Sequence, residues 1–195
     1  MKKGLLLALA TITIGLVSYA AVQLNKWNYD ASHAKVGFSI THMSISDVDG
    51  YFKDVTATIT SSKEDLSDAV AEMTAQVSSI TTNNEKRDGH LLSSDYFDAE
   101  KYPTITFKST SFKKAKLPNA YVINGNLTMH GVTKAVSFAA IIKKGMNPMS
   151  NKMTAGFKVS GKIKRKDFNI GTTTPAAILG EEVEVNINAE FIKES

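Results

Sequence analysis

Residues 182–191, EVEVNINAEF, alternate without exception between a polar and an apolar side chain. The apolar members are Val183, Val185, Ile187, Ala189 and Phe191. Successive side chains of a β-strand point to opposite faces of the sheet, so this pattern predicts a strand with one face in water and the other in a core. The segment therefore indicates a β-protein whose strands are half buried.

Seven further segments show the same period of two. They cover residues 35–40, 55–60, 72–77, 105–107, 121–129, 132–142 and 153–163. Eight half-buried strands with short connections favour an antiparallel sheet that closes on itself, because closure leaves no unpaired strand edge. The predicted fold is all-β, an eight-stranded antiparallel barrel. The only helical interruption is expected between the third and fourth strands, at about residues 83–100, as a short cap.

The expected inward-facing side chains leave two interpretations of the barrel interior open. Many are small or flexible: Ala57, Ala75, Ala140, Ala155, Ala189, Met73, Met129 and Met153. Small and pliable side chains leave room for an apolar guest or adapt to one. Alternatively, the alanines only match bulky partners such as Phe38 and Phe157 across a filled core.

The N-terminus has the pattern of a secretory signal peptide. Lys2 and Lys3 precede a charge-free run over residues 4–22, and Ser18-Tyr19-Ala20 offers small residues for cleavage. We therefore expect a signal peptide over residues 1–20 and a single mature domain over residues 21–195, of ordinary domain size. An uncleaved membrane anchor is the alternative, since the run approaches the length that spans a bilayer.

Composition excludes several classes of protein. The chain contains no cysteine, so neither disulfides nor a lipoprotein anchor can hold it. Its formal net charge of +4 falls by two if Lys2 and Lys3 are removed, and the remaining basic residues are scattered along the predicted strands. Nucleic-acid binding calls for a clustered basic surface, so we expect no nucleic-acid partner.

The four histidines, His33, His42, His90 and His130, do not form a recognisable metal motif. A zinc site needs three or four converging ligands, commonly nucleated by a closely spaced pair, and no such pair occurs. No nucleophile elbow or comparable arrangement is present either. We therefore expect no metal, no cofactor and no catalytic residue. His130 precedes Gly131 at a predicted turn, and we expect it to tie the two strand ends by hydrogen bonds, with Thr128 and Thr133 sharing the network.

Arg87, Asp88 and His90 form a polar cluster in the predicted helical cap. The planar guanidinium of Arg87 could receive an anionic or carbonyl head group. The alternative is an Arg–Asp network that only pins the cap to the barrel wall.

Several longer motifs resemble the YceI family of polyisoprenoid-binding, lipocalin-like proteins. They are WNYDASHAKVGFSITH (27–42), VDGYF (48–52), RDGHL (87–91) with DYFDAEKYPTITF (95–107), GNLTMHGVTK (125–134) and KRKDFNIG (164–171). The resemblance implies an eight-stranded lipocalin-like barrel with a hydrophobic channel for a long isoprenoid chain. Exported members are typically periplasmic. The chain departs from the family pattern at Ala34, where serine is usual, and at Asn169, where glycine is usual and where asparagine tolerates φ > 0.

The resulting functional prediction is a non-enzymatic periplasmic carrier or storage protein for a polyprenyl chain or an isoprenoid quinone. The expected channel residues are Phe38, Ile40, Phe107, Met129, Phe138, Phe157 and Val159. The expected rim or head-group residues are His33, Arg87, Asp88, His90 and His130. Transient membrane contact and a dimer are compatible with this prediction. The alternative is an enzyme that modifies such a lipid with the His/Arg/Asp cluster.

Overall fold

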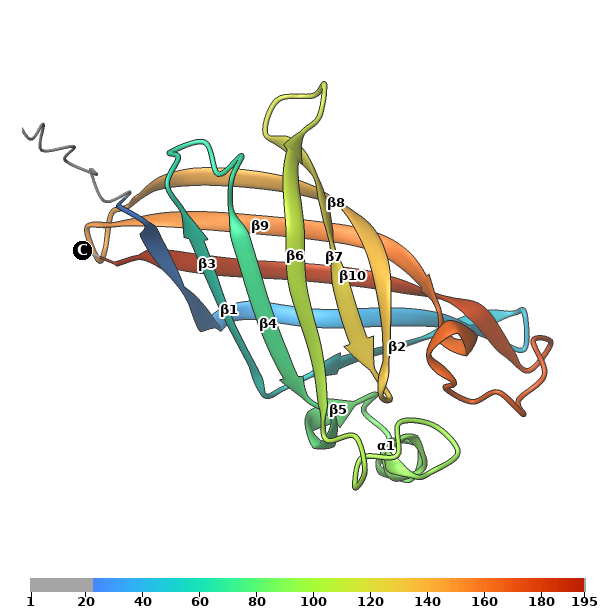
Figure 1. Ribbon diagram of the computed structural model, residues 1–195. Helices are drawn as coiled ribbons and strands as arrows, with labels where there is room; N and C mark the ends of the chain where they lie inside the picture. Colours follow the sequence, from blue (N-terminus) through green and yellow to red (C-terminus); the bar gives the residue numbers. More distant parts are fainter. Residues whose placement is uncertain (1–22, 195) are drawn as a thin grey trace, which may run out of the picture.

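The computed structural model describes residues 23–194, so the predicted signal peptide lies outside the described residues (Figure 1). Ten strands form one antiparallel sheet, with one short α-helix and two 3₁₀ turns. In chain order the elements are β1 (Asn25–His42), β2 (Ser46–Phe52), β3 (Val55–Ser61), β4 (Val70–Gln76), η1 (Val77–Ser79), β5 (Ile80–Thr81), α1 (Glu85–Leu92), β6 (Thr104–Lys114), β7 (Ala120–Met129), β8 (Val132–Asn147), β9 (Lys152–Lys164), η2 (Arg165–Phe168) and β10 (Leu179–Lys193). Among the described residues, no helix has the length and apolar character needed to cross a membrane.

Eight of these strands close into a barrel. The hydrogen-bonded order is β10-β9-β8-β7-β6-β4-β3-β1, and β1 pairs back with β10. Each ring strand overlaps one of the eight predicted segments, and α1 lies between the third and fourth of these segments. The predicted fold, an all-β eight-stranded antiparallel lipocalin-like barrel with a short helical cap, is confirmed.

β1 is long and bent, and its two halves have different neighbours on one side. Residues 25–28 pair with β3, whereas residues 36–42 pair with β2. The pairing of β1 with β10 shifts register between Asp30 and Lys35, at the bend. β2 and β5 therefore extend the barrel wall at one end only.

The sequence prediction missed β2, because its core-facing position next to Phe38 is a glycine. Phe38 pairs with Gly50, and a Cβ at Gly50 would overlap the Phe38 ring. The prediction also ended β6 too early. A bulge between Ser109 and Ser111 shifts the alternation, so that Phe107 and Phe112, on opposite parities, both face inward.

The interior holds two packed clusters, one towards each end of the barrel. At the end of the barrel where β1 begins and β10 finishes, the β3–β4 loop (residues 62–69) folds over the opening. Leu66 in this loop is only 1% exposed and belongs to the same cluster as Trp27, Phe112 and Tyr121. Leu66 has a φ of 57°, which costs energy in a residue with a side chain. Burial of the leucine against this cluster offsets that cost.

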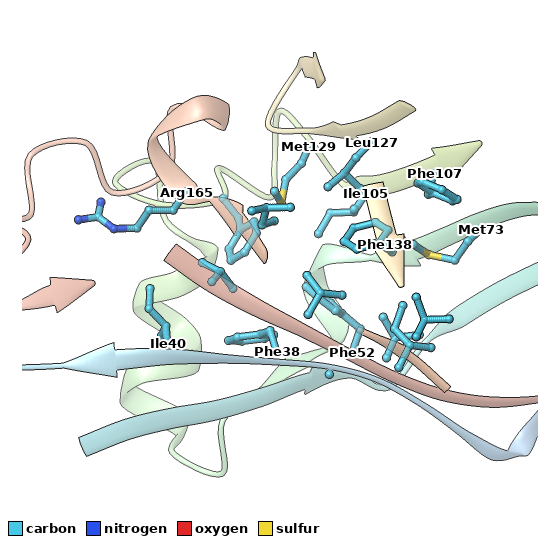
Figure 2. Close-up of a pocket in the computed structure, with 18 of the residues that line it drawn as sticks. Phe38, Ile40, Phe52, Met73, Ile105, Phe107, Leu127, Met129, Phe138 and Arg165 are labelled. Atoms are coloured by element: carbon cyan, nitrogen blue, oxygen red, sulfur yellow. The ribbon is translucent and has the colours of Figure 1, made fainter. Parts of the chain in front are cut away.

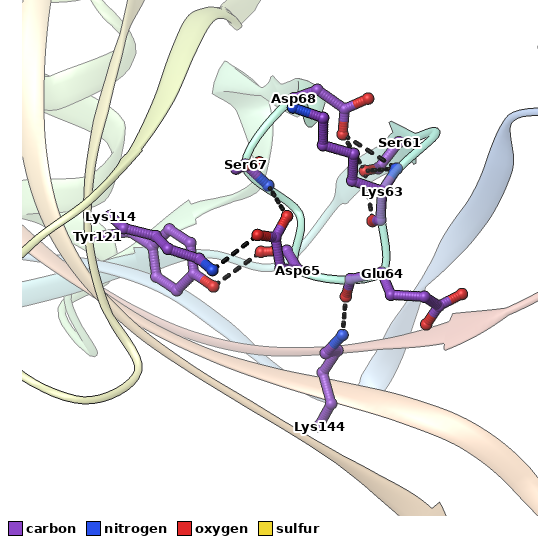
Figure 3. A network of polar contacts seen from close by, with 9 residues as sticks. All are labelled: Ser61, Lys63, Glu64, Asp65, Ser67, Asp68, Lys114, Tyr121 and Lys144. Carbon is purple, nitrogen blue, oxygen red and sulfur yellow. Dashed lines mark hydrogen bonds and ion pairs between the residues drawn. The ribbon is translucent and has the colours of Figure 1, made fainter.

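Polar contacts hold this loop in place (Figure 3). Asp68 accepts hydrogen bonds from Ser61 and Ser62, and these bonds hold the pKa of its carboxyl well below the usual range. Asp65 forms an ion pair with Lys114 (2.6 Å), which lowers the pKa of Asp65. The Tyr121 hydroxyl donates to the backbone oxygen of Asp65 (2.8 Å). Leu66 therefore closes this end of the barrel, and we call it the plug. We call the polar contacts of Asp65 and Asp68 that hold its loop the clasp.

Removing the plug is expected to destabilise the fold. Leu66→Ala should lower the free energy of unfolding by about 2–5 kcal/mol, because it leaves a cavity in a packed cluster. Urea denaturation measures this change, with Leu117→Ala as the control: Leu117 lies on an exposed loop at the same end of the barrel. Equal, small effects for both variants would contradict the plug.

Acid is expected to loosen the clasp. A carboxyl whose pKa is lowered by folding contributes stability above its unfolded pKa, about 3.9, and loses this contribution as the pH falls below that value. The melting temperature should therefore be steady from neutral pH to about pH 5 and then fall. In Asp68→Asn the fall should be shallower, because one of the two carboxyls of the clasp whose pKa is lowered, Asp65 and Asp68, is gone. An acid limb as steep as that of the wild type would contradict this role of Asp68.

Candidate functional site

An elongated cavity of about 400 Å³ occupies the barrel interior, a volume typical of small-molecule sites. Its wall is mostly apolar and comes from both halves of the barrel (Figure 2). All seven residues predicted for the channel line it, namely Phe38, Ile40, Phe107, Met129, Phe138, Phe157 and Val159. Alternation along the strands predicted this lining, since side chains of one parity share a face.

Aromatic rings lie against the wall of the cavity where the neighbouring strand has a glycine. A Cβ at Gly161 of β9 would overlap the Phe138 ring, and a Cβ at Gly125 of β7 would overlap the Phe107 ring. The two rings are tilted at 58° with their centroids 6.0 Å apart. The glycines thus let large rings cover the sheet closely, which leaves the centre of the barrel unfilled.

The sequence left two roles open for the small and flexible residues: leaving room for an apolar guest, or packing against bulky partners in a filled core. The structure shows some of them in each role. Ala75, Ala140 and Ala155 are buried and do not line the cavity, so they serve packing. Ala57, Ala189, Met73 and Met129 line it. Near the closed end, the Phe157 and Phe191 rings meet edge to face at 5.1 Å and form part of the inner wall.

The cavity extends towards the end of the barrel that carries α1, where polar side chains appear. Arg87 and His90 of α1 line it, together with Tyr96 and Thr174. The His90 ring packs edge to face on Tyr96 at 4.9 Å, and the Tyr96 hydroxyl lies 3.1 Å from Thr174 Oγ1. Tyr96 falls within a motif that the sequence singled out, but its role at the mouth was not predicted.

Arg87 and Asp88 anchor α1 to the chain before it. Arg87 donates from Nε to Thr82 Oγ1 (2.7 Å) and from Nη2 to the Thr82 carbonyl (2.9 Å). Asp88 accepts from the Thr82 N–H (2.7 Å) and from Thr81 Oγ1 (3.1 Å). Burial raises the pKa of Asp88, but these hydrogen bonds and the charge of Arg87 outweigh it, so the net shift is downward. The pinning interpretation of this pair is supported, with Thr82 as the link and Asp88 outside the cavity lining.

Arg165 is a further residue of the mouth that the sequence prediction missed. Its side chain is 2% exposed and donates to the carbonyl oxygens of five residues: Ile170, Gly171, Thr174, Leu179 and Gly180. No carboxylate pairs with it among residues 23–194. Arg165 thus holds the β9–β10 connection in shape. Asn169 in this connection has a φ of 59°, so the expectation that it tolerates a left-handed conformation is confirmed.

His33, a predicted rim residue, does not line the cavity. It lies in the bent part of β1, is exposed, and bonds through Nδ1 to Asp30 Oδ2 (2.9 Å). This bond raises the pKa of His33, whereas bonds from Ser32 and His33 lower that of Asp30. Ligand-type atoms of Asp30, His33 and Glu190 lie within 4.8 Å of one another on the outer surface. The absence of a metal site stays a prediction.

His130 does act as a strut, but to a different partner from the one expected. His130 and Gly131 have φ values of 51° and 71° and form the tight turn between β7 and β8. His130 Nδ1 lies 3.1 Å from the Phe168 carbonyl oxygen, while Thr128 and Thr133 bond to each other at 2.8 Å. The expected network across the two strand ends was therefore wrong: His130 joins the hairpin to η2. It does not line the cavity.

We expect His130→Leu to lower the free energy of unfolding by about 1–3 kcal/mol, because the Phe168 carbonyl loses its partner. His130→Gln keeps a donor and should cost less. Thermal melts of both variants and of the wild type, with and without a chelator and with added zinc, separate a strut from a metal ligand. A zinc-induced rise in the wild-type midpoint that His130→Gln removes would contradict the strut.

The chain is similar to known proteins over most of its length. Residues 27–191 match the model of the YceI-like domain family. A protein from Salmonella newport, called Protein YceI, is 39% identical over the whole of both chains. A protein of the same name from Salmonella arizonae is 38% identical over the same extent.

Three solved structures share the barrel. The Campylobacter jejuni YceI protein superposes with a TM-score of 0.72 at 33% identity, over 80% of this chain and 90% of that one. Burkholderia cenocepacia BcnA gives a TM-score of 0.73 at 25% identity, over 83% and 98% of the two chains. A polyisoprenoid binding domain from Saccharophagus degradans gives 0.62 at 14% identity, over 86% and 98%, and supports the fold alone.

Proposed function

This chain belongs to the YceI-like family, and we propose that its barrel binds one isoprenoid lipid, a polyprenyl chain or an isoprenoid quinone, as a periplasmic carrier or storage protein. The proposal includes the predicted export: cleavage of residues 1–20 would release residues 21–195 as the binding domain. The Saccharophagus degradans domain, which shares the barrel fold with this chain, is itself described as a polyisoprenoid binding domain.

The observation that carries the proposal is an apolar cavity that is closed at one end and open at the other. Leu66 and the clasp block the end where β1 begins and β10 finishes, and apolar side chains line the barrel between this plug and the mouth. Moving each CH₂ group from water into such an interior contributes about 0.8 kcal/mol, so a long apolar chain gains affinity without any catalytic group. A tail that enters first would leave a polar head group beside Arg87, His90 and Tyr96.

The alternative, an enzyme that uses Arg87, Asp88 and His90, receives less support from their contacts. Asp88 accepts hydrogen bonds from Thr81 and Thr82 and does not line the cavity. His90 Nε2 lies 3.5 Å from an exposed carboxylate, that of Asp95, rather than from Asp88. An acid–base pair needs both of its groups within reach of one substrate. Here His90 lines the cavity and Asp88 does not, so the two cannot act on the same substrate atom.

A substitution that fills the cavity tests the proposal. Gly161→Val should displace the Phe138 ring into the cavity, because the new Cβ would overlap it. We expect the lipid that co-purifies from the native host, measured by extraction and mass spectrometry, to fall several-fold per mole of protein. Gly156→Val is the matched control on β9: nothing lies closer than 4.0 Å to its new Cβ, so lipid retention should be unchanged.

Circular dichroism and thermal melts establish that both variants fold. Lipid retention at the wild-type level in a folded Gly161→Val variant would contradict binding in this cavity. Recovery of a chemically altered lipid from the wild type, compared with the membrane pool of the same cells, would favour the enzyme instead.

A further inference from the structure

Two loops lie side by side at the open end of the barrel. The first, residues 41–46, is the β1–β2 turn with the strand ends that flank it. The second, residues 171–180, runs from the β9–β10 connection into the start of β10, and both lie at the right of Figure 1. The Met43 N–H donates to the Ile178 carbonyl (2.8 Å), and His42 pairs with Leu179. His42, Thr174, Ile178 and Leu179 also line the cavity, so these loops form part of its mouth.

The surface of these loops is apolar and free of fixed charge. Met43, Ile45 and Ile178 are 53%, 83% and 47% exposed, and Pro175, Ala176 and Ala177 are exposed beside them. Neither segment contains Asp, Glu, Lys or Arg. Single exposed apolar residues are ordinary on a soluble protein, but a contiguous group indicates an interaction surface. We call residues 41–46 and 171–180 the apolar tip.

The opposite end of the barrel carries more charge. It also exposes Met149 and Leu117, but the loops and strand ends there contain many charged residues: Lys63, Glu64, Asp65, Asp68, Lys114, Lys116, Lys144, Lys152 and Lys193. At the apolar tip the charged residues Asp47, Glu181 and Glu182 only flank the two segments. Leu66 and the polar clasp close the interior there. Exposed apolar surface and access to the cavity therefore coincide only at the apolar tip, within residues 23–194.

We propose that the apolar tip inserts into the interfacial layer of a lipid bilayer, so that the ligand passes between membrane and cavity without crossing water. This inference rests on the proposed function, because an isoprenoid lipid is itself dissolved in a bilayer. The tip carries no basic residue, so the interaction should not require anionic lipids. A few inserted side chains give weak, reversible binding, as a carrier needs.

A stable protein partner fits these loops less well. Specific protein interfaces bury roughly 800 Å² on each partner, which is much more than a few loop side chains provide. Ser44, Ser46, Thr172 and Thr173 are exposed in the same two segments, and their hydroxyls can bond to lipid head groups. Continuity of the tip with the cavity mouth is the feature that favours a membrane.

The absence of cysteine from the chain allows a direct test. Ile45→Cys, and Met149→Cys at the opposite end as the matched control, are each labelled with an environment-sensitive fluorophore. On addition of phosphatidylcholine vesicles, emission of the label at position 45 should shift to the blue and increase, at low and high salt alike. The label at position 149, which is 96% exposed as methionine, should not respond. No response at position 45, or equal responses at both positions, would overturn the proposal.

A transfer experiment separates this proposal from the proposed function. The protein is mixed with phosphatidylcholine vesicles that contain the polyprenol solanesol, and protein-bound solanesol is measured over time. Ile45→Asp should slow uptake roughly tenfold, because a charge must enter the interface, without changing the amount bound at equilibrium. Met149→Asp should take up solanesol at the wild-type rate.

The two hypotheses fail differently. No uptake by the wild type, with a normal fluorescence response at position 45, would contradict isoprenoid binding and leave the apolar tip supported. Normal uptake that Ile45→Asp does not slow would contradict the tip and leave binding in the cavity supported.

Discussion

The pairing of β1 with β10 is the interaction on which the rest of the structure depends. These strands are the first and last of the ring, and their antiparallel ladder turns an open sheet into a closed wall. Without it, both strands would expose unpaired backbone groups, and the chain has no disulfide to hold them. The register shift between Asp30 and Lys35 bends β1, so that the same strand completes the ring with β3 and extends the wall with β2.

Closure creates an interior with two different ends. At one end Leu66 and its polar clasp act as a floor. At the other, α1 is fixed through Thr82 and the β9–β10 connection through Arg165, so both are held around the mouth. Between the ends, glycines opposite Phe107 and Phe138 keep these rings against the wall. The cavity thus depends on Gly125 and Gly161, which have no side chain, as well as on the apolar side chains that line it.

The sequence predicted well the ring strands and which side chains line the cavity, because both follow from a period of two that is local to each strand. It missed β2, where Gly50 interrupts the apolar alternation, and the second half of β6, where a bulge changes parity. The rim was predicted less well. Arg87 and His90 do line the cavity, but His33, Asp88 and His130 do not. The position of His33 depends on the bend of β1, that of Asp88 on its contact with Thr82, and that of His130 on its contact with Phe168. None of these features follows from a period of two along a strand. Arg165 was missed for the same reason, since its partners are backbone carbonyls.

If the barrel interior holds an isoprenoid chain with its polar end at the mouth, a high-resolution crystal structure of the protein purified from its native host, without added ligand, should reveal that chain. We expect continuous electron density for one apolar chain that runs from Phe157 past Phe138 and Phe107 and ends beside Arg87 and Tyr96. Density for ordered water in the cavity, or for the lipid on the outer face of the barrel, would contradict it.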